Sequence, residues 1–452
     1  MTGRYKAYPE YKSTDEVWLG NVPSHWRDLK INRLTIVKRG ASPRPIDDPK
    51  YFDEAGEYSW VRIADVTASD TYLEHTPQRL SPLGASLSVK LEPNELFLSI
   101  AGTVGKPCIN KIKACIHDGF VYFPEYKENT KFLFYIFAAG EAYKGLGKFG
   151  TQLNLNTETV GGIKIGIPCI EEQHKIVSFL DHETAKIDTL IAKQEKLIEL
   201  LKEKRQAVIS HAVTKGLNPN APMKDSGVEW LGEVPEHWSL CSIKYLCREI
   251  TDGAHISPDL KEGVHHFVSI KDIKNGEINF DDSLLTSEES YHYLVKTGCM
   301  PFEGDILFSK DGTIGQTAIT PPNKDFVVAS SLIIIRPNLE KVSSEYLDLM
   351  LQSSLVKEQV ESFVKGAALR RLSIQNLLKV FGLRPPLNEQ KKIAEHVNLQ
   401  LSKFSALEDK AQKQVQLLQE RKTALISAAV TGKIDVRHFV AEQEQPQGVQ
   451  DE

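Results

Sequence analysis

The sequence predicts a mixed α+β fold in which two globular domains alternate with two long helices that pair as an antiparallel coiled coil. Two observations lead to this prediction. A set of short motifs occurs twice, in the same order, along the 452 residues, and each set ends in more than 40 residues without glycine or proline. The first observation indicates an internal duplication. The second indicates a helix longer than those of an ordinary compact domain.

Four pairs of matching segments carry the duplication. Their spacing changes only by loop-sized steps, so the repeated unit is about 210 residues long. A repeat of this length is a duplicated domain with its helix, and not a solenoid. The pairs are WLGNVPSHW (18–26) and WLGEVPEHW (230–238), LFLSIAGTVGK (96–106) and ILFSKDGTIGQ (306–316), PCIEEQHKI (168–176) and PPLNEQKKI (385–393), and AVISHAVT (207–214) and ALISAAVT (424–431).

Before the P-x-x-x-E-Q-x-x-I motif, each copy has the sequence pattern of a globular domain. Short β-branched and aromatic runs such as YSWVRIADV and DILFSK alternate with glycine, proline, asparagine and aspartate, which is typical of strands and turns. KFLFYIFAAGEAYK and SSEYLDLMLQSS instead read as helices. Each domain is therefore expected to consist of strands with a few short helices.

The stretches 171–214 and 387–431 contain neither glycine nor proline and are expected to be single helices. Each would be about 66 Å long at ~1.5 Å per residue, and its seam needs a partner. The other copy is the nearest one, so we expect antiparallel pairing with approximate twofold symmetry. The alternative is that each helix packs only on its own domain. Apolar residues at three- and four-residue steps, interrupted by Gln194 and Gln414, predict a seam of Ile187, Leu190, Leu197, Leu201 and Val208 with Phe404, Leu407, Leu418 and Leu425.

These patterns also give domain boundaries. Proline marks the start of each long helix, glycine marks its end, and turn formers fill the segment between the two copies. The tail lacks apolar periodicity and is expected to be disordered. The predicted segments are an N-terminal extension (1–15), domain 1 (16–168), a central helix (169–215), a linker (216–227), domain 2 (228–385), a C-terminal helix (386–433) and a tail (434–452).

Composition and charge narrow the function classes. No apolar run reaches membrane-spanning length, and the first residues, MTGRYKAYPEYKSTD, lack the apolar core of a signal peptide. Six cysteines form no C-x-x-C pair, so we expect a cytoplasmic protein without a zinc site or disulfides. The net charge is −5. Any role in DNA binding must therefore rest on local patches or on the charge of a partner.

Two catalytic motifs are weak. Residues 145–150 match G-x-G-x-x-G, but a helix-like stretch precedes them and the second copy, VKGAALRRL, lacks the pattern, so a flexible loop is favoured over a cofactor site. Asp259, Asp272 and Lys274 match the loose pattern of metal-dependent nucleases, yet Thr67 replaces the lysine in the first copy. No zinc-enzyme histidine pattern or phosphate-binding loop is present. The chain is expected to be non-catalytic and to bind no metal.

Loops that follow the predicted strands carry the residues expected to bind DNA. Arginine and lysine can read guanine, glutamine and asparagine can read adenine, and aspartate can accept from cytosine. For either G-T-x-G segment alone, a hairpin turn that needs positive φ is the simpler interpretation. The two loop sets occupy matching places but differ in chemistry, as expected for readers of two different sequences. The candidates are Arg39, Ser42, Arg44, Arg62, Asp65, Thr103, Lys106, Lys148, Thr151, Gln152 and Asn154 in the first copy, and Asp252, His255, Lys271, Asp272, Lys310, Thr313, Gln316, Lys365, Arg370 and Arg371 in the second.

Together the repeated motifs resemble the specificity subunit of a type I DNA restriction–modification system. The resemblance rests on W-L-G-x-V-P-x-H-W, G-T-x-G and P-x-x-x-E-Q-x-x-I, each present twice, and on T-D-G-A-H-x-S-P from residue 251. Each motif is weak alone, whereas their duplicated order is specific. The resemblance implies two target-recognition domains, each of which reads one half of a bipartite, asymmetric DNA site, and it implies no catalytic residue in this chain.

The same resemblance implies partners. Two methyltransferase subunits would dock on the paired helices and bring S-adenosylmethionine, and ATP- and Mg²⁺-dependent restriction or translocase subunits would join them in defence against phage. This chain would bind no cofactor and no membrane. Approach to the major groove from one side would place the half-site centres about one helical turn, ~10 bp, apart. A metal-dependent nuclease and a coiled-coil scaffold for protein binding are the other hypotheses.

Overall fold

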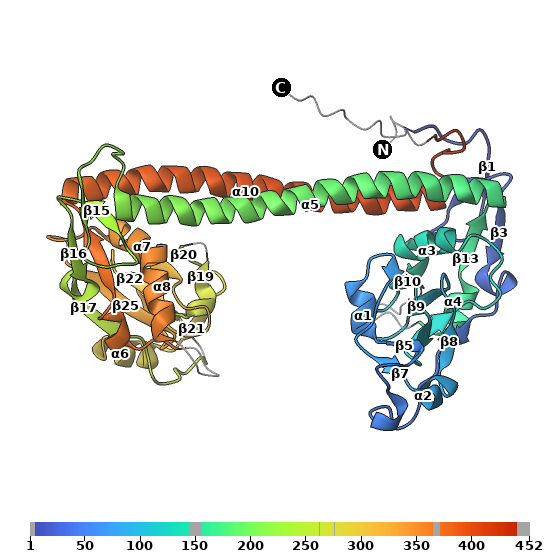
Figure 1. Ribbon diagram of the computed structural model, residues 1–452, viewed down its shortest axis with the longest axis horizontal. Helices are drawn as coiled ribbons and strands as arrows, with labels where there is room; N and C mark the ends of the chain where they lie inside the picture. Colours follow the sequence, from blue (N-terminus) through green and yellow to red (C-terminus); the bar gives the residue numbers. More distant parts are fainter. Residues whose placement is uncertain are drawn as a thin grey trace. The chain divides into compact units, whose positions relative to one another are not determined.

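The chain folds as two compact units connected by its long helices. Unit 1 comprises residues up to Gln194 and from Lys413 onward, and unit 2 comprises Glu195–Gln412. Each long helix therefore contributes one part to each unit. None of the helices in the described ranges is long and apolar enough to cross a membrane. The computed structural model in Figure 1 describes residues 5–144, 146, 155–261, 263–274, 276–364 and 371–440.

Unit 1 contains short strands and helices that come before the first long helix. Its strands are β1 (Tyr11–Ser13), β2 (Asn21–Pro23), β3 (Arg27–Lys30), β4 (Lys38–Arg39), β5 (Tyr58–Val61), β6 (Tyr72–Leu73), β7 (Arg79–Leu80), β8 (Val89–Leu91), β9 (Leu96–Ser99), β10 (Pro107–Asn110), β11 (Ala114–Ile116), β12 (Phe120–Tyr122) and β13 (Lys164–Ile167). Its helices are η1 (Ile31–Arg33), η2 (Pro49–Tyr51), α1 (Ile63–Ala68), α2 (Pro82–Ser86), α3 (Thr130–Ala138), η3 (Glu141–Tyr143), α4 (Thr157–Gly162) and the first part of α5 (Ile170–Lys215).

Two sheets form the framework of unit 1. The strand order is β4-β12-β9-β10-β6 in one sheet and β7-β5-β11-β8 in the other. Neighbouring strands are antiparallel, except that β10 pairs with β6 and β11 pairs with β5 in parallel. Helix α3 packs against β9 and β10, and its Phe132 and Ile136 are buried in one core with Leu98 and Ile109. A separate antiparallel pair, β3 with β13, leads directly into α5.

Unit 2 contains a second set of elements. Its strands are β14 (Met223–Asp225), β15 (Glu233–Pro235), β16 (Ser239–Ser242), β17 (Cys247–Asp252), β18 (His265–Val268), β19 (Ile273–Lys274), β20 (Glu277–Ile278), β21 (Leu284–Thr286), β22 (Ile306–Ser309), β23 (Thr317–Ile319), β24 (Phe326–Val328), β25 (Leu332–Pro337) and β26 (Phe381–Arg384). Its helices are η4 (Ile243–Tyr245), η5 (Ile270–Asp272), α6 (Glu288–Lys296), α7 (Ser344–Gln352), α8 (Ser354–Phe363), α9 (Ile374–Leu377) and the first part of α10 (Leu387–Val430).

The topology of unit 2 repeats that of unit 1. One sheet has the order β17-β25-β22-β23, as β4-β12-β9-β10 has in unit 1. The other has the order β21-β18-β24, in which β18 and β24 are parallel like β5 and β11. Strand β26 pairs with β16 and leads into α10, as β13 leads into α5. The predicted duplication and mixed α+β fold are confirmed.

The two long helices lie side by side (Figure 1). In unit 1 the N-terminal part of α5 packs with the C-terminal part of α10, where Ile187, Leu418 and Leu425 are buried in one core. In unit 2 the C-terminal part of α5 meets the N-terminal part of α10. Leu201 is buried there, and Phe404 packs against the core of unit 2, which includes Ile209 of α5 and Leu401 of α10. This pairing is antiparallel, as predicted, and each helix also contacts the domain of its unit.

Three of the predicted seam residues are wrong. Leu190, Leu197 and Leu407 are 45%, 40% and 46% exposed, respectively. The seam follows a strict three- and four-residue alternation that passes through polar positions such as Arg205 and Glu408, which are half-buried. Leu190 and Leu197 stand next to the half-buried Ile191 and Ile198, and Leu407 stands next to the half-buried Glu408. Apolar character alone does not select the correct residue of each pair, and a shift of one residue turns a side chain about 100° around the helix.

The chain ends are also more ordered than predicted. Ile434 and Val436 are buried, and the ring of Phe439 packs edge-on against Phe179 at a centroid distance of 5.1 Å. The backbone N–H of Asp435 donates to the carbonyl of Lys6 at 2.8 Å. Disorder from residue 434 is therefore wrong for residues 434–440, while the rest of the tail lies outside the described residues. The prediction failed because three apolar residues are too few to give a periodic pattern.

The repeated motifs W-L-G-x-V-P-x-H-W and P-x-x-x-E-Q-x-x-I contact each other in unit 1. Glu172, from the first turn of α5, is buried and accepts hydrogen bonds from the Tyr8 hydroxyl at 2.7 Å and the Trp26 indole N–H at 3.0 Å. Its other oxygen lies 2.8 Å from His25 Nε2. Burial, and then the hydrogen bond to Glu172, raise the pKa of Tyr8, which keeps its hydroxyl a donor. We call Glu172 and these three partners the anchor cluster.

The adjacent glutamine fixes the same helix start to a second element. Gln173 accepts from the backbone N–H of Asn129, the N-cap of α3, at 3.0 Å and donates to the Pro168 carbonyl at 3.0 Å. In unit 2, Gln390 accepts from the N-cap residue of α7, Ser343, at 2.9 Å. The E-Q pair therefore connects each long helix to its domain through both side chains.

The glutamate contact is weaker in unit 2. His237 Nε2 lies 2.7 Å from Glu389, whose side chain is 29% exposed, compared with 5% for Glu172. Trp238 Nε1 is shielded from solvent and has no acceptor among the described residues. His25 and His237 of the two W-L-G-x-V-P-x-H-W motifs therefore both hydrogen-bond to the repeated glutamates.

We expect Glu172→Ala to lower the free energy of unfolding by about 3 kcal/mol, because it leaves two buried donors without an acceptor. Glu389→Ala should cost only about 1 kcal/mol, since its one partner is half-exposed. The exposed neighbour Glu171 provides the control, and Glu171→Ala should change stability by less than about 0.5 kcal/mol. Urea unfolding of the full chain measures all three, and equal losses for Glu172→Ala and Glu389→Ala would contradict the difference between the two clusters.

Candidate nucleic-acid interface

The two G-T-x-G segments form the same turn in both units. Gly102 and Gly105 have φ of 62° and 85°, and Gly312 and Gly315 have φ of 65° and 91°. These values favour glycine at all four positions. The backbone N–H of the last glycine donates to the serine that ends the preceding strand in each unit, at 2.8 Å in unit 1 and 3.0 Å in unit 2. Each turn therefore has a defined backbone conformation between two buried strands.

In unit 1 several loops converge on this turn. A Cβ atom on Gly102 would meet Ile63 at the start of α1, and one on Gly119 would lie 3.4 Å from Ala101. The N–H of Gly40 donates to the carbonyl of Phe120 at 2.9 Å. The structure therefore brings together the predicted DNA-binding loops 39–44, 62–67 and 101–106 and a fourth loop, 117–119.

The fourth loop contains Asp118, which the sequence analysis missed. Its backbone carbonyl accepts from Arg39 Nε at 2.5 Å, and its carboxylate accepts from Ser42 Oγ at 3.2 Å and Arg44 at 2.9 Å. Burial lowers the pKa of the adjacent His117, so that at neutral pH its Nδ1 can accept from the N–H of Gly119 at 2.9 Å. The H-D-G turn between two buried strand runs was the available sequence signal.

The other candidates of unit 1 have separate roles. The carboxylate of Asp65 accepts from the backbone N–H of Arg62 at 2.9 Å and caps α1, while the Arg62 side chain stays exposed. Thr67 connects the candidates Thr103 and Lys106. Its hydroxyl lies 2.7 Å from that of Thr103, and its carbonyl accepts from Lys106 Nζ at 2.8 Å. Asp65 is therefore a structural residue, whereas Arg62 and Thr103 are accessible to a ligand.

The same convergence occurs in unit 2. A Cβ atom on Gly253 would collide with the carbonyl of Ala329, and one on Gly312 would lie 3.9 Å from Ile270. Ser331 accepts from the N–H of Ile270 through its hydroxyl at 3.2 Å and from the N–H of Lys310 through its carbonyl at 3.0 Å. These contacts assemble the loops around residues 252–255, 269–272, 309–316 and 329–331.

Two predicted DNA contacts of unit 2 are used internally. The ammonium group of Lys310 is ion-paired with Asp252, and the Lys310 side chain is only 4% exposed. Asp252 also lies 3.2 Å from His255 Nε2, and the His255 side chain is 63% exposed. Lys310 therefore positions the loop that carries His255 and does not itself reach the surface.

The remaining candidates of unit 2 divide in the same way. Asp272 is buried and caps η5 by accepting from the N–H of Ser269 at 2.7 Å, as Asp65 does in unit 1. Lys271, Thr313 and Gln316 are exposed. Arg371 is also exposed, and it forms an ion pair with Asp311 at 3.0 Å, beside the G-T-x-G turn.

The structure does not support the metal-dependent nuclease. The Asp272 carboxylate is occupied as a helix cap, Lys274 pairs with Asp282 at 3.4 Å, and Asp259 accepts from the backbone of Lys261 at 3.0 Å. In the described part of the chain, no group of three or more histidine, cysteine, aspartate or glutamate side chains could hold a metal ion.

Six candidates and one motif cannot be placed. All of them lie in the segments 145–154 and 365–370, which come shortly before α4 and α9. Those outside the described residues are Lys148, Thr151, Gln152, Asn154, Lys365, Arg370 and the glycines of the G-x-G-x-x-G match, Gly145, Gly147 and Gly150.

The accessible side chains give the two loop clusters different chemistry. Unit 1 exposes three arginines and Thr103, and its cluster has Asp118 as the common acceptor. Unit 2 exposes a lysine, an arginine, a glutamine, a threonine and a histidine. Such donors can bind phosphate oxygens and the base edges of a DNA groove. The two clusters are therefore suited to two different nucleotide sequences.

We expect Asp252→Ala to lower the free energy of unfolding by about 3 kcal/mol, because it leaves the buried ammonium group of Lys310 without its carboxylate. The matched change in unit 1, Arg44→Ala, removes an exposed pair and should cost less than about 1 kcal/mol. Urea unfolding compares the two variants. Asp252→Asn combined with Lys310→Met should recover part of the loss, and a loss no larger than that of Arg44→Ala would contradict the buried role of Lys310.

Comparisons with known proteins identify the family of this chain. Residues 23–200 and 235–417 match the family described as type I restriction modification DNA specificity domain. The EcoBI specificity subunit of a type I restriction enzyme from Escherichia coli is 26% identical over 274 residues, which are 59% of this chain and 56% of that protein. The EcoKI specificity subunit from Escherichia coli strain K12 is 22% identical over 423 residues, which are 88% and 85% of the two chains.

A solved structure shares the fold. It comes from a study of complex assembly and conformational transition of the type I R-M system, and it aligns with a TM-score of 0.68 at 14% identity over 91% of this chain and 99% of that chain. The family match covers most of both units, including α5 up to residue 200 and α10 up to residue 417. The chain therefore belongs to the family of type I restriction–modification DNA specificity subunits.

Proposed function

We propose that the two loop clusters read the two halves of a bipartite, asymmetric DNA site, one half per unit. The observation that carries this proposal is that equivalent loops converge on the same turn in both units but expose different side chains. A duplicated reader with identical loops would recognise a symmetric site. Arg39, Arg44 and Arg62 favour guanine in one half, and Gln316 favours adenine in the other.

The chain acts as a non-catalytic subunit in this proposal. Two methyltransferase subunits bind S-adenosylmethionine and methylate adenine, and restriction or translocase subunits supply ATP- and Mg²⁺-dependent activity. These partners also provide the positive charge that a chain of net charge −5 lacks. If both units approach the major groove from one side, the half-site centres lie about one helical turn, ~10 bp, apart.

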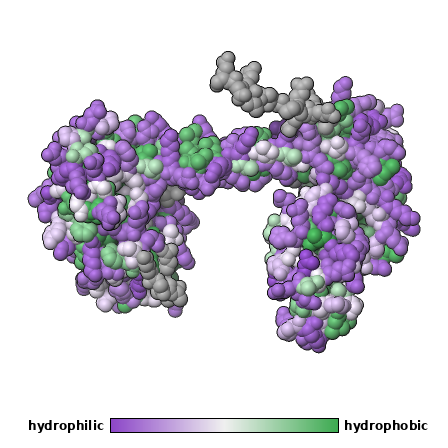
Figure 2. Space-filling view, viewed as in Figure 1, coloured by the Kyte–Doolittle hydropathy of each residue, from purple (hydrophilic) through white to green (hydrophobic). Residues whose placement is uncertain are grey.

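The paired helices offer an apolar surface for these partners. Leu197 and Leu200 of α5 are 40% and 48% exposed, and Leu407 of α10 is 46% exposed. In unit 2 the side of α5 that contacts the domain includes Ile209, which is buried, and Gln206, which donates to the carbonyl of Gln352 at 3.0 Å. Leu200 lies on a different side of α5. Figure 2 shows hydrophobic residues exposed along the long helices on a largely hydrophilic face. A helix from a partner could bury these leucines.

Methylation mapping tests the reading of two half-sites. A host that carries this chain with its methyltransferase should methylate adenines in a single motif of two unlike parts, separated by several unspecified base pairs. The control is the same host with the methyltransferase alone, which should leave the motif unmodified. Methylation of one continuous palindrome would contradict the proposal, because two unlike clusters cannot read identical half-sites.

Charged substitutions test the docking surface. We expect Leu197→Glu combined with Leu407→Glu to reduce co-purification of the methyltransferase at least tenfold, since two buried leucines contribute roughly 1.5–3 kcal/mol each. Ser402→Glu adds one of these two negative charges at an exposed polar position of α10 and should leave co-purification unchanged. Unchanged binding by the leucine variant, with a circular dichroism spectrum like that of the wild type, would rule out these leucines as the docking surface.

A further inference from the structure

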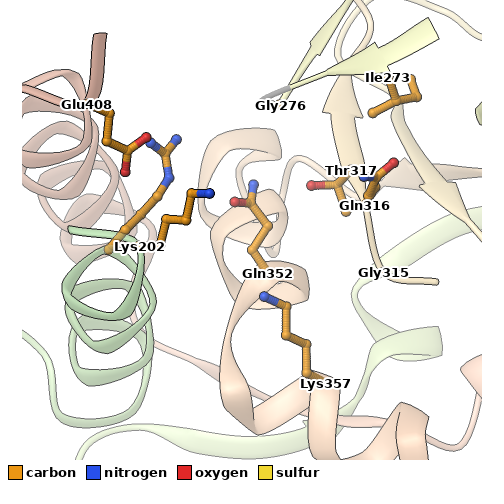
Figure 3. Close-up of a pocket in the computed structure, with 10 residues that line it drawn as sticks. Lys202, Ile273, Gly276, Gly315, Gln316, Thr317, Gln352, Lys357 and Glu408 are labelled. Atoms are coloured by element: carbon orange, nitrogen blue, oxygen red, sulfur yellow. The ribbon is translucent and has the colours of Figure 1, made fainter. Parts of the chain in front are cut away.

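Unit 2 contains a polar pocket between its long-helix segments and its domain. Its volume is about 280 Å³. Figure 3 shows Lys202 and Glu408 on the long helices, Gln352 and Lys357 on the short helices α7 and α8, and Gln316 on the opposite wall. The lining residues are Lys202, Arg205, Ile273, Gly276, Gly315, Gln316, Thr317, Gln352, Lys357 and Glu408. We call this the Lys202 pocket.

The charges that line the Lys202 pocket are not balanced. Lys202, Arg205 and Lys357 face a single carboxylate, that of Glu408. None of the three cations forms an ion pair with a residue that the structure describes. Arg205 donates to Ser405 Oγ at 3.0 Å, and Lys357 donates to the side-chain oxygen of Gln206. For Lys202 the described residues provide no hydrogen-bond acceptor. The pocket therefore has positive charge available for an anion.

The wall opposite the helices leaves the backbone accessible. Gly315 and Gly276 have positive φ, and nothing lies within 4 Å of the position that a Cβ atom would take on either residue. Gly315 belongs to the G-T-x-G turn on which the recognition loops of unit 2 converge, and Gln316 follows it with an exposed side chain. A group bound in the pocket would therefore contact the recognition turn and α5 at the same time.

We propose that the Lys202 pocket binds one phosphate group of the DNA backbone, with Lys202 and Lys357 as its main contacts. This proposal rests on the proposed DNA-reading function. Three cations exclude a metal ion, and the polar lining excludes an apolar ligand. A phosphate fits because lysine and arginine neutralise its charge and Gln316 supplies an amide donor. DNA is favoured over a protein carboxylate because the pocket shares its wall with the recognition turn.

The proposed phosphate contact has no equivalent set of residues on the long helices of unit 1. In the repeat, the helix positions of Lys202 and Glu408 correspond to Gln419 and Ile191 of unit 1. Lys422, which corresponds to Arg205, is neutralised there by Asp188 at 2.6 Å. A bound phosphate would fix the DNA to α5 on the side of unit 2. It would hold that half-site at a set distance along the helix without reading any base.

The test measures DNA affinity of the assembled complex with its methyltransferase over a range of salt concentrations. The probe is a duplex that carries the motif found by methylation mapping, compared with a scrambled duplex. Lys202→Ala combined with Lys357→Ala should weaken binding to both duplexes about tenfold and reduce the salt slope by about 1, as expected for one lost phosphate contact. The methylated motif should not change. Lys202→Arg should retain wild-type affinity because it keeps the charge.

Lys196→Ala is the matched control, because Lys196 lies on the same helix, is exposed and pairs with Glu199 at 2.7 Å. It should leave the affinity and the salt slope unchanged. Wild-type affinity and slope in the double variant would overturn the pocket and leave the proposed function intact. A second outcome would also overturn the pocket proposal: the double variant loses its methyltransferase, while the fraction that stays assembled binds DNA with wild-type affinity. If the wild-type complex does not distinguish the two duplexes, the proposed function fails and the pocket proposal fails with it.

Discussion

The hydrogen bonds between the E-Q pair at the start of each long helix and the domain before it are the contacts on which the rest of the structure depends. Glu172 accepts from Tyr8 and Trp26, and Gln173 holds the N-cap of α3. Because both side chains are buried where β13 leads into α5, the direction of the helix is fixed by the domain. Unit 2 repeats this arrangement with Glu389, His237 and Gln390. In unit 1 a buried carboxylate satisfied by several donors tolerates little displacement. In unit 2 the buried Gln390 supplies the equivalent contact with the domain, so each reading surface is held in a defined orientation to its own helix segment.

This constraint explains why the framing motifs occur twice almost unchanged while the loops between them differ. The histidine of the H-W pair and the glutamate of the E-Q pair must keep their chemistry, because they hydrogen-bond to each other in both units. The G-T-x-G glycines must also stay, since their backbone needs positive φ. Side chains that point outward from the turn, such as Thr313 and Gln316, have no such requirement. A specificity subunit can therefore acquire new recognition residues without changing the contacts that hold its helices.

Much of this architecture could be predicted from the sequence, because repeated motifs and long stretches without glycine or proline are strong local signals. The helix seam was only partly predictable. Its strict spacing includes Ile198 and Glu408, and a pattern of apolar residues alone can select their neighbours Leu197 and Leu407 instead. The site was less predictable still. Asp118 became visible only when strands distant in sequence brought its loop to Arg39 and Arg44. Lys310 looked like a DNA contact because burial and pairing with Asp252 depend on tertiary structure.

Exchange of one domain tests the central claim most directly. Residues 228–385 are replaced by the equivalent segment of another specificity subunit of known motif, with α5, α10 and the E-Q pairs left unchanged, and the methylated sites of the host are mapped. The account predicts that one half of the motif changes to that of the donor, while the other half and the spacer stay the same. A motif that changes in both halves, or that does not change at all, would show that the two units do not read DNA independently on a common scaffold.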